Sequence, residues 1–176
     1  MGGRRRWPGI THTRRALIDA LTVNLRAPSA DEYNAWSAQQ RDSYVEQLVA
    51  SSSMSREAAE AKATRDRGEF LPQGLDTPGH LIFRVEADGQ PVGWLWMALN
   101  NPRSEAGVGF VYDIAIDDAF RGRGYGRAAM QLAEKEARRR GLDALALNVF
   151  AHNAVARNLY ASLGYRETSV QMRKEL

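Results

Sequence analysis

The chain contains no cysteine and no long apolar run. The absence of cysteine excludes disulfide frameworks, thiolate nucleophiles and cysteine-based metal sites. The few histidines are scattered and match no metal-ligand spacing, so we expect no structural metal: they are His12, His80 and His152. No stretch approaches the ~20 apolar residues of a membrane-spanning helix, so we expect no membrane association.

Acidic residues are absent from the first 15 positions, which hold Arg4, Arg5, Arg6, Arg14 and Arg15. The net charge of +3 therefore comes from this end, because acids slightly outnumber bases in the remainder. We predict a basic, flexible tail over residues 1–18 and one domain over residues 19–176. The polar residues after the arginines argue against a signal peptide and against the alternative of a twin-arginine export signal, so we expect a cytoplasmic protein.

Local signals in the first half of the chain predict strands and helices in mixed order. They indicate a strand over 21–26, a helix from a Ser29–Glu32 capping box to about residue 50, a helix from Ser55 that ends at Gly68, and a hairpin turning at Asp88–Gly89.

The second half alternates strands and helices. We predict a central strand over 108–116, a helix over 125–140 followed by Gly141, a strand over 144–150, a helix from Asn153 to Gly164, and a final strand over 165–176. The strands at 108–116 and 144–150 should run parallel because a helix connects them. The predicted fold class is α/β, with a mixed, mostly antiparallel sheet of six or seven strands and helices on both faces.

Glycine and arginine crowd the loop at 121–127, between the strand at 108–116 and the next helix. Gly122, Gly124 and Gly126 allow unusual backbone conformations and close approach of a ligand. Unpaired N–H groups and the dipole at a helix N-terminus favour phosphate, and Arg121, Arg123 and Arg127 add positive charge. The spacing matches neither a P-loop nor a dinucleotide fingerprint, so we expect another phosphorylated small molecule.

This loop resembles the acyl-CoA-binding signature of the GNAT superfamily of N-acetyltransferases, in which Arg or Gln precedes two residues, Gly, any residue, and Gly or Ala. The matching residues are Arg121, Gly124 and Gly126. Residues 147–165 resemble the second motif of the superfamily, through Asn153, Tyr160, Gly164 and Tyr165. The two motifs occur in the right order, separated by a predicted helix and strand.

The resemblance implies acetyl-CoA as co-substrate and a GNAT-like fold. It implies that the pyrophosphate of coenzyme A is held by the amides of Arg121, Gly122, Arg123, Gly124, Tyr125 and Gly126 together with Arg127. The backbone of Ile114, Ala115 and Ile116 would bind the pantetheine arm as an added strand does, with Asn153 on its other side. Tyr160 would protonate the departing thiolate as general acid.

The general base is open, because Tyr112 stands where many members of the superfamily have a Glu. The candidates are Asp113, Glu69, His80 and Glu105. The acceptor should lie among aromatic residues, namely Trp36, Trp94, Trp96, Phe110 and Tyr112, some of which can equally form core. As substrate contacts we predict Trp94, Tyr112 and Asp113.

Three functions stay open at this point. The favoured one is acetyl transfer from acetyl-CoA to a primary amine of a small molecule, amino acid or peptide, by direct attack in a ternary complex. A second is an acyl or aminoacyl transferase that uses another acyl-CoA or a charged tRNA, the only nucleic-acid partner considered. The third is a non-catalytic acyl-CoA-binding module, against which the matching Tyr160 argues. We expect a monomer or a homodimer.

Overall fold

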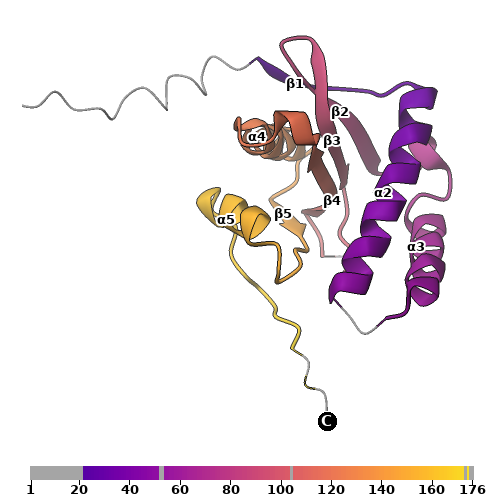
Figure 1. Cartoon of the computed structure of the whole chain (residues 1–176). Coiled ribbons are helices and arrows are strands. Elements are labelled where there is room, and N and C mark those ends of the chain that lie inside the picture. Colours follow the sequence, from indigo (N-terminus) through magenta and orange to yellow (C-terminus); the bar gives the residue numbers. More distant parts are fainter. Residues whose placement is uncertain (1–21, 52–53, 104, 173, 175–176) are drawn as a thin grey trace, which may run out of the picture.

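The computed structural model describes residues 22–51, 54–103, 105–172 and 174 (Figure 1). The predicted tail at 1–18 lies outside them. The elements follow one another as β1 (Val23–Arg26), α2 (Ala30–Ser51), α3 (Arg56–Phe70), the short 3₁₀ helix η1 (Gly74–Asp76), β2 (His80–Ala87), β3 (Gln90–Ala98), β4 (Val108–Ile116), η2 (Asp118–Phe120), α4 (Tyr125–Arg139), β5 (Ala144–Leu147) and α5 (Ala154–Ser162).

The sheet has five strands among the described residues, in the order β1-β2-β3-β4-β5. All neighbours are antiparallel except β4 and β5, which run parallel as predicted. The α/β class is confirmed, but the expected six or seven strands are not found. The final strand predicted from residue 165 onward is absent over 165–172, where side chains make the cross-links instead: Arg157 pairs with Glu167, and Arg103 donates to Ser169.

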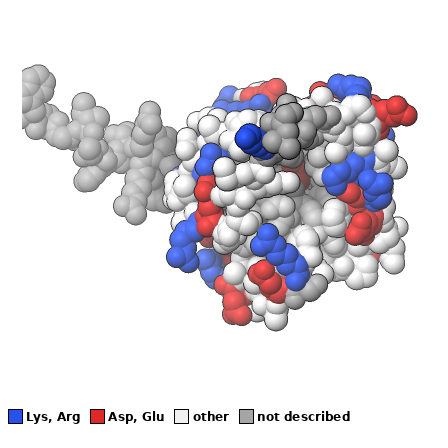
Figure 2. Space-filling view, turned by 90° about the horizontal axis from the view of Figure 1, so that it is seen from below, with Lys and Arg blue, Asp and Glu red and all other residues white. Residues whose placement is uncertain are grey.

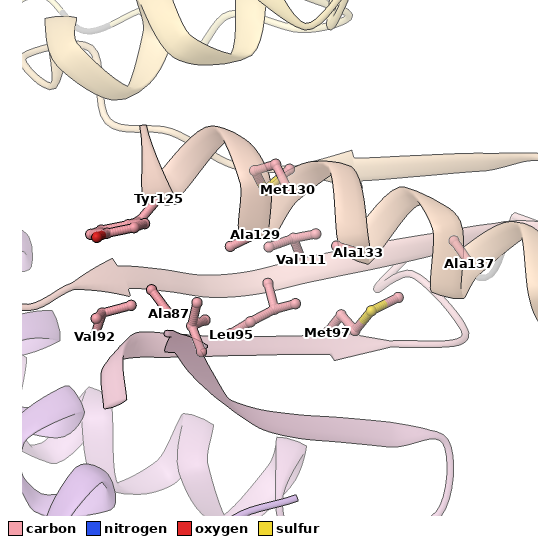
Figure 3. Close-up of a cluster of buried hydrophobic side chains, with 11 residues drawn as sticks. Ala87, Val92, Leu95, Met97, Val111, Tyr125, Ala129, Met130, Ala133 and Ala137 are labelled. Carbon is pink, nitrogen blue, oxygen red and sulfur yellow. The ribbon is translucent and has the colours of Figure 1, made fainter. Parts of the chain in front are cut away.

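Helices cover both faces of the sheet. Figure 1 shows α4 and α5 on one side and α2 and α3 on the other. The alternation of side chains along β3 serves both layers, because Leu95 and Met97 join the core beneath α4 while Trp94 and Trp96 join the cluster with Trp36 of α2. Figure 3 shows the first core, in which Ala129, Ala133 and Ala137 line one stripe of α4 and let the helix lie close to β3 and β4.

Several local signals act as predicted. The Ser29 hydroxyl accepts from the Glu32 N–H at 3.2 Å, and the Glu32 carboxylate accepts from the Ser29 N–H at 2.8 Å, which is a complete capping box. Asp88 and Gly89 have φ of 52° and 77°, the backbone of a type I′ hairpin turn. The Ser55 hydroxyl likewise accepts from the Ala58 N–H at 3.2 Å at the start of α3.

One predicted helix end is wrong. Helix α3 continues through Gly68 to Phe70, and Gly68 does not have a positive φ. The helix ends at Leu71, the residue before Pro72, because the proline ring disfavours helical backbone at the preceding position. None of the described helices is both long enough and apolar enough to span a bilayer.

Candidate active site

A β-bulge at Tyr112 shapes the centre of the molecule. Trp96 pairs with Asp113 while the next residue of β3, Met97, pairs with Val111, so Tyr112 is an extra residue in β4. A bulge bends its strand and redirects side chains. Pairing between β4 and β5 ends at Val111 and Leu147, and β4 continues to Ile116 beside β3 alone. We call this divergence of β4 and β5 the split.

Residues 112–116 of β4 therefore form an open edge next to the split. An added Cβ on Gly93 of β3 would collide with the Ala115 carbonyl oxygen, which is thus directed at β3. Since successive residues of a strand direct their backbone groups to opposite sides, those of Ile114 and Ile116 are directed at the split. Of the three residues predicted to bind a pantetheine arm, Ile114 and Ile116 direct their backbone groups at the split, whereas Ala115 directs its backbone groups at β3.

The loop after β4 presents a row of free backbone donors. Within the described chain, the N–H groups of residues 122–127 form no hydrogen bond, and the first helical bond of α4 runs from Ala128 N–H to the Gly124 carbonyl at 3.1 Å. Gly124 precedes α4 with φ of 90°, a left-handed conformation that other residues adopt at a cost. We call residues 122–127 the amide loop. Its geometry suits an anion such as a pyrophosphate.

The three arginines of the loop are occupied with the protein itself. Arg121 donates to the Ile116 carbonyl at 3.1 Å and pairs with Asp118, Arg123 donates to the Ala119 carbonyl at 3.0 Å, and Arg127 donates to the Ser162 hydroxyl of α5. Arg121 and Arg123 remain exposed. Their charges lie near the amide loop, but each guanidinium must exchange or share a partner to contact a ligand.

Helix α5 closes the split from the side of α4. Asn153 caps the helix by accepting from the Ala156 N–H at 3.1 Å. Gly126 of α4 faces α5 and β4, since an added Cβ would lie 3.5 Å from Leu159 and 3.8 Å from Ile116, both ordinary contact distances. Tyr160 packs partly buried against the core, with its ring 5.9 Å from that of Tyr165. Burial and the negative charge of Asp113 raise the pKa of Tyr160, so the phenol stays protonated at neutral pH.

Asp113 is the ionisable group at the centre of the site. Burial raises its pKa to about 6, against three weaker effects that lower it, from the indole of Trp36, the charge of Arg67 and the N–H of Ile114. The Trp36 Nε1 is close enough to act on this pKa but reaches no acceptor within hydrogen-bond geometry. A carboxylate with this pKa is mostly ionised at pH 7 and can still accept a proton.

The other candidates for general base are placed less well. His80 accepts from Trp96 Nε1 at 3.0 Å through Nδ1, so its free lone pair is used, and burial lowers its pKa. Glu69 is exposed on α3, although its charge adds to the larger effect of burial in raising the pKa of Tyr112. Glu105 lies in the turn before Val108, at the end of β4 away from the split.

The aromatic residues form a packed cluster. Trp36 stacks on Trp94 with centroids 5.4 Å apart, and Trp96 stacks on Tyr112 at 4.5 Å. Trp94 is only 6% exposed, so its burial argues against the predicted contact with an acceptor. Phe110 is buried as well, whereas Tyr112 and Asp113 keep part of their surface exposed. The bulge places these two at the border of the cluster, facing α3.

Charges of both signs alternate over the face of the molecule that is seen from below in Figure 2. Figure 2 shows Lys and Arg side chains beside Asp and Glu side chains around a largely uncharged centre. The described residues on the face in this view form no continuous basic stripe of the kind that tracks a nucleic-acid backbone.

Reasoning from the sequence missed Arg67, which lies 46 positions before Asp113 and whose charge reaches it. Only the packing of α3 against α2 and β4 reveals this neighbour. One signal in the sequence could have indicated it. Arg67 lies about one helical turn before the apolar residues Phe70 and Leu71, which suggests that it shares their inward-facing side of the helix.

Comparison with known proteins identifies the family. The model of the acetyltransferase (GNAT) family matches residues 38–165. The protein named uncharacterized N-acetyltransferase YycN, from Bacillus subtilis (strain 168), is 33% identical over 159 residues, which are 89% of this chain and 100% of that protein. Mycothiol acetyltransferase of Salinispora tropica is 29% identical over 161 residues, covering 91% of this chain but only 49% of its own length.

Solved structures agree with this assignment. The crystal structure of YycN from Bacillus subtilis superposes with a TM-score of 0.81 at 32% identity, covering 88% of this chain and 99% of that one. The aminoglycoside N-acetyltransferase AAC(6′)-Iy, in complex with CoA, has a TM-score of 0.57 at 16% identity, covering 89% and 96%. At this identity the second likeness concerns the fold alone.

Proposed function

Because the chain belongs to the GNAT acetyltransferase family, we propose that it transfers an acetyl group from acetyl-CoA to a primary amine of a small molecule, amino acid or peptide. The proposal includes direct attack of the amine in a ternary complex, with Asp113 as general base and Tyr160 as general acid. Residues 19–176 form the catalytic domain in this proposal.

The observation that carries it is the convergence of three features on the split. The amide loop offers unpaired N–H groups at the start of α4, the open edge of β4 offers the backbone of Ile114 and Ile116, and Asp113 and Tyr160 flank the opening. A long, flexible thioester with a pyrophosphate at one end fits this order of groups, since the anion is held first and the arm then follows the edge.

The residues of the chain have separate tasks in the reaction. Acetyl-CoA supplies an activated acyl group as a thioester. The amide loop binds its pyrophosphate, while Ile114 and Ile116 orient the pantetheine arm along β4. Asp113 takes a proton from the ammonium group of the acceptor, directly or through one water, so that the neutral amine attacks. As the C–S bond breaks, Tyr160 gives its phenolic proton to the departing sulfur, and the second proton lost by the attacking nitrogen restores the phenol through water. Asp113 releases its proton to solvent, and the amide product and free thiol are left.

The protonation states required are those that the environment favours. Asp113 is ionised above its pKa of about 6, and Tyr160 is protonated because its pKa is raised. Each group is thus ready for its task over the neutral range. Burial raises the pKa of both groups, and such perturbed pKa values gathered in one place are typical of an active site.

Ligand-induced stabilisation followed by turnover tests the proposal. Thermal melting with acetyl-CoA, coenzyme A, ATP and NAD side by side should show stabilisation by the first two, about 2.7 kcal/mol at ~100 times the dissociation constant. An amine panel should then release thiol from acetyl-CoA. Stabilisation without turnover would favour a binding module, and failure of both CoA species to stabilise would redirect attention to a charged-tRNA donor.

A further inference from the structure

A buried guanidinium with an unused donor lies beside the proposed base. Arg67 is in the last turn of α3, and its Nη2 donates to the Ser37 carbonyl at 3.1 Å and to Gln40 Oε1 at 2.7 Å, both in α2. Its Nη1 is buried and reaches no partner within hydrogen-bond geometry among the described residues, although the Tyr33 hydroxyl is close enough to act on the pKa of Arg67. The side chain is therefore held from one side only.

The position of this guanidinium is also fixed by stacking. Its carbon lies 5.5 Å from the centroid of the Trp36 ring, and Trp36 is 3% exposed. Two hydrogen bonds to α2 and an aromatic face leave the guanidinium little freedom, so Nη1 keeps its direction. A donor that is held in place and unpaired is rare in protein interiors and points to a group from outside the chain.

The charge of Arg67 is not neutralised locally. Arg67 forms no salt bridge within the described residues, and its relation to Asp113 is one of charge at longer range. A buried cation of this kind is stabilised by an anion with matching geometry, and a carboxylate accepts from guanidinium nitrogens in the same plane.

From this arrangement we infer that Arg67 binds a carboxylate of the acceptor, so that the substrate is an amine that also carries a carboxylate, such as a free amino acid. The inference rests on the proposed function, because the amine of the same molecule must then lie between Asp113 and the split. Tyr33, Arg67 and Asp113 all keep part of their surface exposed, which gives a small acceptor access from solvent. Contact with Nη1 itself requires side-chain adjustments of the kind common on binding.

The opposite charge pattern would be expected for a polycationic acceptor. Such a molecule needs several acidic side chains around it, and a half-buried Arg67 whose charge reaches Asp113 would repel it. Arg67 thus separates anionic amines from cationic ones within the broad class proposed above.

A panel of matched acceptors tests the inference on the unmodified protein. Thiol release from acetyl-CoA is measured with amino acids, their carboxamides and their methyl esters, and rates are expressed per concentration of neutral amine, because the derivatives have less basic amines. The acids should have kcat/KM at least about tenfold above their carboxamides, as expected for a charge-assisted hydrogen bond. Equal values for acids and carboxamides would overturn the inference and leave the acetyltransferase proposal intact.

Variants of Arg67 test whether the preference for acids depends on this residue. Arg67→Gln should remove most of the preference for acids through a higher KM, Arg67→Lys should keep part of it, and Arg65→Gln, an exposed position on the same helix, should leave it unchanged. The affinity for acetyl-CoA should stay the same in all three, as a check on folding. If Arg67→Gln does not fold, Arg67→Lys and the acceptor panel decide. A preserved preference in a folded Arg67 variant would contradict the inference, and no thiol release with any amine would count against the proposed function and this inference together.

Discussion

Beyond the larger effect of burial, the charge of Asp113 on β4 raises the pKa of Tyr160 on α5, although the two residues belong to opposite sides of the split. A different structural feature positions each residue. The bulge in β4 positions Asp113, and helix α5 with its Asn153 cap positions Tyr160. Their electrostatic contact means that the ionisation of one group affects the other, which is what a proton donor and a proton acceptor in one reaction require.

Replacing Asp113 should lower the activity and raise the stability of the protein. Asp113→Asn keeps the shape but removes a buried charge, so we expect kcat/KM to fall by about 10²–10⁴ while the free energy of unfolding at pH 7 rises by about 1–3 kcal/mol. The rise follows from linkage: the folded pKa of about 6 exceeds the ordinary 3.8, so the charged form weakens the fold at higher pH. The gain should therefore fade as the pH falls from 6 toward 3.8.

Denaturant unfolding at pH 7 and at pH 4 measures this difference. The exposed Asp42→Asn, in α2, serves as the matched control and should change neither quantity appreciably. A loss of stability at pH 7 in Asp113→Asn would show that this carboxylate is a structural group whose charge the fold requires.

The activity should depend on pH with an acid limb set by Asp113. Below about 6 the carboxylate becomes protonated and can no longer take the proton of the acceptor, so kcat/KM should fall about tenfold per unit. Ionisation of the acceptor amine produces a second inflection at higher pH. Profiles from pH 5 to 9 for the wild type and Asp113→Asn distinguish the two, because only the lower inflection should vanish in the variant.

Removing the Tyr160 hydroxyl should slow the chemical step without weakening binding. For Tyr160→Phe we expect kcat to fall by about 100-fold, at the low end for a general acid because a thiolate leaves readily. The binding of coenzyme A should be unchanged. Tyr165→Phe is the matched control, since the buried Tyr165 hydroxyl reaches no partner within hydrogen-bond geometry in the described part of the chain and its loss should be nearly neutral. Equal rates for Tyr160→Phe and the wild type would assign Tyr160 to packing alone.

Alanine variants of two glycines with similar backbone conformation can distinguish an effect on stability from an effect on coenzyme A binding. Gly122 and Gly141 have φ of 76° and 79°, and an added Cβ meets nothing within 4 Å at either position. Alanine at either should therefore cost roughly 1–2 kcal/mol of stability for the same reason. Only Gly122→Ala should also weaken coenzyme A binding, because it lies in the amide loop. Calorimetric titration of both variants compares them, and equal affinities would remove Gly122 from the proposed cofactor site.

Much of the fold was predictable because its signals are local. The capping box at Ser29, the hairpin at Asp88–Gly89 and the glycine-rich start of α4 depend on residues that are near one another in sequence. The hydrogen bonds and backbone angles of one turn or one helix end are determined by a short stretch of sequence. The alternatives of a P-loop or a dinucleotide fold were excluded on spacing, and family membership agrees.

The features that the sequence did not reveal depend on packing between residues that are far apart in the chain. The bulge at Tyr112 arises from the register between β3 and β4, which no pattern within β4 reveals. The contact of Trp94 with the acceptor was predicted from its aromatic character and stays a prediction. Its burial in the cluster with Trp36 follows from where α2 packs, which no pattern within β3 reveals. The final strand was predicted from alternation alone, but residues 165–172 are tied down by side chains.

The near-ultraviolet circular dichroism of the tryptophan residues can report on the acceptor side of the molecule. Trp36, Trp94 and Trp96 lie in one buried cluster beside Asp113, and the fourth tryptophan, Trp7, lies outside the described residues. Stacked indoles couple their electronic transitions, so the near-ultraviolet circular dichroism of this protein should be strong and should change when α2 shifts against the sheet. The cluster thus provides an intrinsic optical signal for acceptor binding that needs no label and no turnover.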